Sequence, residues 1–81
     1  MSALHEVVLY RSPGCHLCEE AANLVRGLQR SRGFAFTEVD IHSDPELERR
    51  YLFEIPVIEV DGVVVTQAPV DIARVRLAVA E

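Results

Sequence analysis

The spacing of hydrophobic positions changes near residue 15. Residues 4–10 end in a run rich in Val, Leu and Tyr, and the turn segment 12–14 follows, which predicts a β-strand. Beyond it, apolar side chains recur three or four residues apart, as they do in a helix. These are Leu17, Ala21, Leu24, Val25 and Leu28. The pattern predicts a helix over residues 15–31 that buries this stripe, and Gly33 is suited to end it in a left-handed conformation.

A second strand and a second helix are predicted next. Residues 34–41 carry Phe, Val and Ile, which favour a strand. Segment 43–46, Ser-Asp-Pro-Glu, supplies a capping side chain, a proline and an acidic residue, all typical of a helix start. This helix should end near Phe53, because Pro56 favours an extended conformation for the residue before it. The aromatic residues are expected in or near the core. They are Tyr10, Phe34, Phe36, Tyr51 and Phe53.

The last third of the chain predicts a hairpin and a helix. Asp61-Gly62 stands between the β-branched runs 57–60 and 63–65, and Asp-Gly is a strong signal for a two-residue hairpin turn. The tail 69–80 fits both an alternating and a helical pattern, and its frequent Ala favours a helix. The predicted order is β-α-β-α-β-β-α. Strands joined by a helix pair in parallel, and hairpin strands pair antiparallel. The expected fold class is therefore α/β, a four-stranded mixed sheet with helices on both faces.

Length and composition restrict the classes of protein. Eighty-one residues provide for one domain, 1–81, with one core. A chain that is 49% hydrophobic and 26% charged is typical of globular proteins rather than disordered ones. Uninterrupted apolar runs reach four residues, whereas a membrane helix needs about 18–20, so no membrane partner is expected. The first residues show no basic stretch followed by an apolar one, which favours a cytoplasmic location.

The distribution of charge argues against nucleic acid as a partner. The net charge is −5, and the basic residues are eight arginines spread along the chain. No basic stripe suits a phosphate backbone.

The chemistry is concentrated in the only two cysteines, Cys15 and Cys18, at the predicted junction of the first strand and its helix. Positions i and i+3 share one side of a helical turn, which brings the two Cα atoms within reach of a disulfide. The unpaired N–H groups and positive end of the helix favour a thiolate at the first cysteine. The second is one turn deeper and is placed to attack a mixed disulfide formed by the first. The segment therefore predicts a redox-active pair.

Two structural roles are alternatives for the cysteine pair. A structural disulfide would close a very small loop and would constrain the unfolded chain little. A zinc site would need the cysteines together with His5, His16 or His42, but closed zinc sites usually take four ligands, often as two separated pairs. No metal is therefore predicted at this site. His16 follows the first cysteine, and in protonated form it would favour the thiolate.

Segment 10–19, Tyr-Arg-Ser-Pro-Gly-Cys-His-Leu-Cys-Glu, resembles the active-site segment of the short glutaredoxin-like family, which has a thioredoxin fold. Val39-Asp40-Ile41 resembles the end of that family's second strand. Ile55-Pro56-Val57 resembles the segment that carries its cis proline. The resemblance covers nearly the whole chain.

The resemblance implies roles for individual residues. Cys15 would be the nucleophile and Cys18 the resolving thiol. Pro56 would be cis, and the backbone of Ile55 would pair with an extended substrate. Arg11 stands where the family carries a basic residue before its active site, so with His16 it is a candidate substrate-binding residue.

The sequence departs from the family at positions that concern glutathione. Leu17 stands where an aromatic residue is usual between the cysteines, and Thr66-Gln67 replaces the family's Gly-Gly turn. No cofactor is therefore predicted. Glutathione enters only as a possible reductant, without an evident binding site.

These observations predict a small thiol–disulfide oxidoreductase. Its substrate would be a disulfide-containing protein or a low-molecular-weight thiol compound, and a reductase or glutathione would supply electrons. A non-enzymatic alternative is a redox sensor or docking module that binds a partner through the hairpin and the surface around Ile55-Pro56. A metal-binding module ranks third. One fold hosts many functions, so the resemblance alone does not decide among them.

Overall fold

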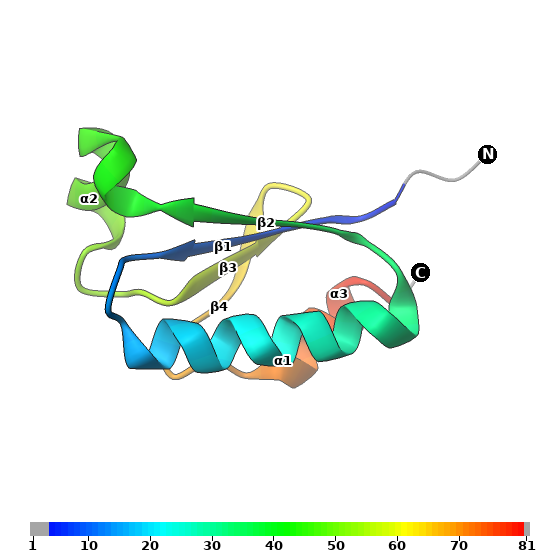
Figure 1. Cartoon of the computed structure of the whole chain (residues 1–81). Helices are drawn as coiled ribbons and strands as arrows, with labels where there is room; N and C mark the ends of the chain where they lie inside the picture. Colours follow the sequence, from blue (N-terminus) through cyan, green and yellow to red (C-terminus); the bar gives the residue numbers. More distant parts are fainter. Residues whose placement is uncertain (1–3, 81) are drawn as a thin grey trace.

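The computed structural model describes residues 4–80, so residues 1–3 and 81 of the predicted domain lie outside the described part. The elements follow one another in the predicted order (Figure 1). They are β1 (Glu6–Arg11), α1 (His16–Arg32), β2 (Ala35–Asp40), a 3-10 turn (Ile41–Ser43), α2 (Pro45–Tyr51), β3 (Val57–Val60), β4 (Val63–Gln67) and α3 (Ile72–Ala78). The order β-α-β-α-β-β-α is thereby confirmed. No helix within residues 4–80 is long and apolar enough to cross a membrane.

The four strands form one mixed sheet in the order β2-β1-β3-β4. β1 runs parallel to β2, and β3 runs antiparallel to both β1 and β4. Arg11 pairs with Asp40 across β1 and β2, and Tyr10 pairs with Val57 across β1 and β3. The last residues of β1 and β2 and the first residue of β3 therefore lie at the same end of the sheet. This end also carries the start of α1.

The ends of the elements match the signals in the sequence. The Asp44 carboxylate accepts a hydrogen bond from the Glu46 amide at 2.9 Å, and Pro45 opens α2. Gly33 ends α1 at a φ of 73°, and its N–H donates to the Gln29 carbonyl. Asp61 and Gly62 have φ of 53° and 85°, as a tight turn between antiparallel strands requires.

The helices cover the two faces of the sheet unequally. α1 and α3 lie along one face, and α2 lies at one end of the other (Figure 1). The larger core cluster fills the space between α1, α3 and the sheet. Its buried members are Val7, Leu9, Ala21, Ala22, Val25, Leu28, Phe34, Ile58, Val60, Val75 and Val79. The smaller cluster lies between α2 and the sheet. Its buried members are Ile41, Tyr51 and Val57.

Three expectations about burial were wrong. Leu17 and Leu24 are 56% and 48% exposed, and Phe53 is 95% exposed. The buried face of α1 is a neighbouring stripe that includes Cys18, Ala22 and other small or β-branched side chains. Small residues let the helix lie close to the sheet, so the two leucines remain at its flank. Phe53 follows the last turn of α2, in the segment that leads back to β3.

Candidate functional site

Cys15 and Cys18 form a disulfide at the point where β1 passes into α1. Their Cα atoms are 5.2 Å apart, within the range of about 4.4–6.8 Å usual for disulfides. Cys15 is partly exposed, whereas Cys18 is fully buried. One sulfur is therefore accessible to another molecule, and the other is shielded behind it.

Cys15 is also the N-cap of α1. Its Sγ accepts a hydrogen bond from the Cys18 amide at 3.1 Å, and its own N–H donates to the Ser12 carbonyl at 3.3 Å. Gly14 provides the sharp entry into the helix with a φ of 77°. On reduction, the Cys15 sulfur would stay at the positive end of a 17-residue helix, next to an amide donor. This environment favours the thiolate form.

Ile55 and Pro56 lie at the same end of the sheet as the disulfide. Pro56 is buried and directly precedes Val57, which pairs with Tyr10, and the Ile55–Pro56 peptide bond is cis. The Ile55 N–H donates to the Tyr51 carbonyl at 3.1 Å. Because that donor is used within the protein, the Ile55 carbonyl oxygen is the main-chain group of this residue that could pair with an extended substrate.

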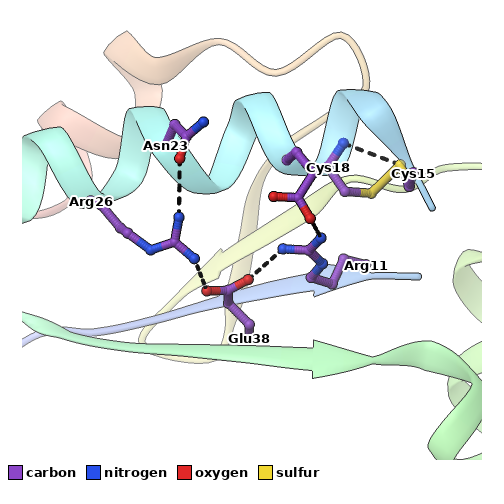
Figure 2. A network of polar contacts seen from close by, with 7 residues as sticks. Arg11, Cys15, Cys18, Asn23, Arg26 and Glu38 are labelled. Carbon is purple, nitrogen blue, oxygen red and sulfur yellow. Dashed lines mark hydrogen bonds and ion pairs between the residues drawn. A yellow bond between two sulfur atoms is a disulfide. The ribbon is translucent and has the colours of Figure 1, made fainter. Parts of the chain in front are cut away.

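Arg11 lies between the first turn of α1 and the sheet, in a network of ion pairs (Figure 2). Its side chain is 15% exposed, and its guanidinium donates to Glu19 of α1 and, at 2.5 Å, to Glu38 of β2. The second oxygen of Glu38 accepts from Arg26 at 2.6 Å. The hydrogen bond to Glu19 raises the pKa of Arg11 above its ordinary value against the opposing effect of burial. The structure thus places Arg11 near the cysteines, but its donors point to carboxylates that join β1, α1 and β2.

His16 follows Cys15 and points away from the core. Its side chain is 84% exposed, and its Nε2 lies 2.9 Å from a carboxylate oxygen of Glu20, one turn along α1. Protonated, it would place a positive charge in the first turn of the helix. Within residues 4–80, no group of three or more His, Cys, Asp or Glu side chains is arranged to hold a metal ion.

A pocket beside the disulfide was missed by the sequence reasoning. It has a volume of about 180 Å³, and α1 forms one wall while the segments before β3 and after β4 form the other. Its lining residues are Leu17, Glu20, Ala21, Leu24, Pro56, Ala68, Pro69 and Val70. The available signal was a second apolar stripe on α1, with Leu17, Ala21 and Leu24 offset by one position from Cys18, Ala22 and Val25.

The partners of Arg11 were missed as well. In β2, Phe36 packs against the core under α1, and alternation places Glu38 on that same face. A carboxylate on this face, next to the end of β1, was the signal for the ion pair with Arg11.

Comparison with known proteins identifies a family. The model of the "Glutaredoxin-like domain (DUF836)" matches residues 6–79. A solution NMR structure of protein Ne2328 from Nitrosomonas europaea is similar at 25% identity with a TM-score of 0.85, over 98% of this chain and 95% of that one. An X-ray structure of protein XcR50 from X. campestris is similar at 32% identity with a TM-score of 0.70, over 88% and 91%.

More distant structures establish the fold. Thioredoxin 1 from Thermosipho africanus is similar at 11% identity with a TM-score of 0.66, over 93% of this chain and 90% of that one. Curated proteins gave no match. The chain has a thioredoxin-like fold, and its paired cysteines support a redox-type role that involves thiols or disulfides.

Proposed function

The chain belongs to the glutaredoxin-like family defined by this domain model, and from that premise we propose that it is a thiol–disulfide oxidoreductase. The observation that carries the proposal is the asymmetry of the Cys15–Cys18 disulfide. Cys15 is partly exposed and caps α1, whereas Cys18 is buried one turn further on. A nucleophile has to reach its substrate, and a resolving thiol has to reach only the nucleophile.

This geometry supports a two-step thiol–disulfide exchange. The Cys15 thiolate attacks one sulfur of a substrate disulfide, which forms a mixed disulfide and releases the other substrate sulfur as a thiolate. Cys18 loses its proton and attacks the Cys15 sulfur, which releases the second substrate thiolate and leaves the Cys15–Cys18 disulfide. A dithiol or two monothiols then reduce this disulfide by the reverse exchanges, with transfer of two electrons. The substrate is a disulfide-containing protein or a low-molecular-weight compound.

Other residues have supporting roles in the proposal. Pro56 and the Ile55 carbonyl would border the incoming substrate chain. His16, beside Cys15 and exposed, would add positive charge near the thiolate when protonated. Arg11 would act mainly by holding the first turn of α1 against the sheet, since its donors already meet Glu19 and Glu38.

The electron donor is either glutathione or a reductase. Two features at and just after Thr66-Gln67, which replaces the family's Gly-Gly turn, favour a reductase. The Asp71 carboxylate caps α3 by accepting from the Ala73 amide at 3.0 Å, and the Thr66 hydroxyl accepts from the Asp71 amide at 3.0 Å. These groups are engaged in starting the helix. A cytoplasmic location is proposed as well, and it agrees with the proposed function because disulfides in that compartment are mostly catalytic or redox-sensing.

The test combines activity measurements on two cysteine variants with the reduction potential of the Cys15–Cys18 pair. Cys15→Ser should abolish turnover of disulfide substrates, and its hydroxyl retains a capping group for α1, so the fold should persist. Cys18→Ser should accumulate mixed disulfides on Cys15, visible by mass spectrometry. Equilibration in graded glutathione buffers should give a potential between roughly −200 and −270 mV.

The same measurements separate the alternatives. A redox sensor would form the disulfide within this range of potentials but would turn over general disulfides slowly. Turnover by Cys15→Ser at the wild-type rate would overturn the mechanism. A pair that stays reduced or oxidised in all buffers would favour a metal-binding or structural role.

A further inference from the structure

We propose that the pocket beside the disulfide binds a large apolar side chain next to the reactive cysteine of a polypeptide substrate, with preference for a basic residue close by. The inference rests on the proposed function and specifies its substrate class. The pocket begins at Leu17, which lies between the two cysteines, and extends along α1 to Leu24. A side chain neighbouring a cysteine that is attacked by Cys15 would thus be within reach of it.

The size and lining of the pocket suit one apolar group. Its volume is about 180 Å³, and a dry apolar cavity of about 150 Å³ in a protein accommodates benzene. Apart from Glu20, the lining side chains are those of Leu, Ala, Pro and Val. Leu17 and Leu24 are about half exposed, and a bound side chain would remove both from water. Exposed apolar surface of this kind is typical of an interaction site.

The charges around the pocket indicate the rest of the partner. Glu20 is the only charged residue in the lining. The nearby cation, Arg11, is neutralised by Glu19 and Glu38. An anionic ligand such as glutathione, which carries two carboxylates, meets no cation in the lining. The Glu20 carboxylate lies 2.9 Å from the exposed ring of His16 and is itself more than half exposed, so it remains accessible from solvent. A polypeptide with Lys or Arg near its cysteine is complementary to this carboxylate.

The experiment compares matched peptides. Each carries a single cysteine as a mixed disulfide with thionitrobenzoate, and the neighbouring residue is Leu or Ser. Release of the coloured thiol by the fully reduced protein gives a second-order rate constant, which is divided by the rate for dithiothreitol to remove intrinsic differences in reactivity. We expect the Leu peptide to react about tenfold faster than the Ser peptide. A Lys at the next position should raise the rate, and a Glu there should lower it.

Variants connect this preference with the pocket. Leu24→Asp places a charge in the lining. It should bring the ratio of the rate constants for the Leu and Ser peptides close to one. Leu77→Asp is the matched control, because Leu77 is an exposed leucine of α3 outside the pocket, and it should leave the ratio unchanged. Using the ratio within each variant cancels changes in the reactivity of the cysteines.

The outcomes separate this inference from the proposed function. If peptides that dithiothreitol reduces do not react with the protein, the proposed function fails and the substrate preference fails with it. If both peptides react at equal rates, or if Leu24→Asp keeps the wild-type ratio, the proposed function stands and the pocket inference is overturned. The pocket inference is also overturned if a glutathione mixed disulfide reacts faster than the Leu peptide.

Discussion

The two faces of the sheet are built from different interactions. Between the sheet and α1 and α3, the buried cluster is apolar and spans β1, β3 and both helices, and the ion pairs of Arg11 lie at one end of this face. On the other face, α2 covers one end, and polar groups take part in the packing. The Glu59 carboxylate accepts from the Tyr10 hydroxyl at 3.1 Å and from the Tyr51 hydroxyl at 3.4 Å.

The contacts of Tyr51 on the α2 face hold a segment of the candidate site in place. The rings of Tyr10 and Tyr51 pack with their centroids 4.8 Å apart. The Tyr51 carbonyl accepts from the amides of Glu54 and Ile55, at 2.8 and 3.1 Å. Through Tyr51, this face fixes the segment that carries Pro56. The first face therefore supplies most of the stability, while the second aligns a loop next to the disulfide.

The largest loss of stability is expected in the apolar cluster between the sheet, α1 and α3. Leu9 is fully buried in the centre of the sheet, and Leu9→Ala removes its side chain and leaves a cavity. The free energy of unfolding should fall by about 2–5 kcal/mol. For a domain of this size, which is marginally stable, that is a large part of the total. Chemical denaturation measures the change through the midpoint of the transition.

Two neighbouring valines provide the matched control. Val7 is buried on the α1 side, whereas Val8 points to the opposite face and is only partly buried. Val7→Ala should lower the free energy of unfolding by about 2 kcal/mol, and Val8→Ala by about half of that or less. Equal losses in the two variants would show that the faces contribute alike.

The apolar face also shows how far the sequence predicts this fold. The strands, helices, caps and hairpin depend on residues close together in the chain, and their order was predicted correctly. Which face of each helix is buried depends on residues that are distant in the sequence. Leu17 fits the helical period as well as Cys18, but only Cys18 meets the sheet, because the small side chains beside it set the distance of approach.

The candidate site also has a part that local sequence predicts and a part that depends on distant residues. The disulfide between Cys15 and Cys18 follows from a spacing of three and the junction of a strand with a helix, so it was predicted. The pocket and the Arg11 network join side chains from segments far apart in the sequence. Alternation along β2 places Glu38 on the α1 face, but its contact with Arg11 depends on the parallel pairing of β2 with β1.

A smaller loss of stability is expected for the ion pairs of Arg11, on the face of the sheet that α1 covers. Arg11→Met keeps the apolar part of the side chain but removes the partner of Glu19 and Glu38. Since Arg11 is largely buried, the free energy of unfolding should fall by about 1–3 kcal/mol. Arg26→Met is the matched control, because Arg26 pairs with the same Glu38 but is more exposed, and its loss should be below about 1 kcal/mol. A loss for Arg26→Met as large as that for Arg11→Met would contradict this account.

The smallest effect is expected on the α2 face, and it depends on pH. Burial, with the hydrogen bond and charge of Glu59 as further causes, raises the pKa of Tyr10 from 10.0 to about 12. The folded state therefore holds this proton more tightly than the unfolded state. The stability that Tyr10 contributes is fully present below pH 10 and is lost as the pH rises toward 12. Tyr10→Phe removes the hydroxyl, so it should lower the free energy of unfolding by about 1 kcal/mol at neutral pH.

The pH dependence gives the sharper test of the same contact. Between pH 10 and 12, the wild-type protein should lose stability more steeply than Tyr10→Phe, and the two curves should converge. Tyrosinate absorbance provides a direct readout, since the difference between the two proteins should titrate near pH 12 when folded and near pH 10 in denaturant. If the stability curves stay parallel across this range, Glu59 and the surrounding packing do not hold the Tyr10 proton. The α2 face would then be stabilised by its apolar contacts, as the buried cluster on the opposite face is.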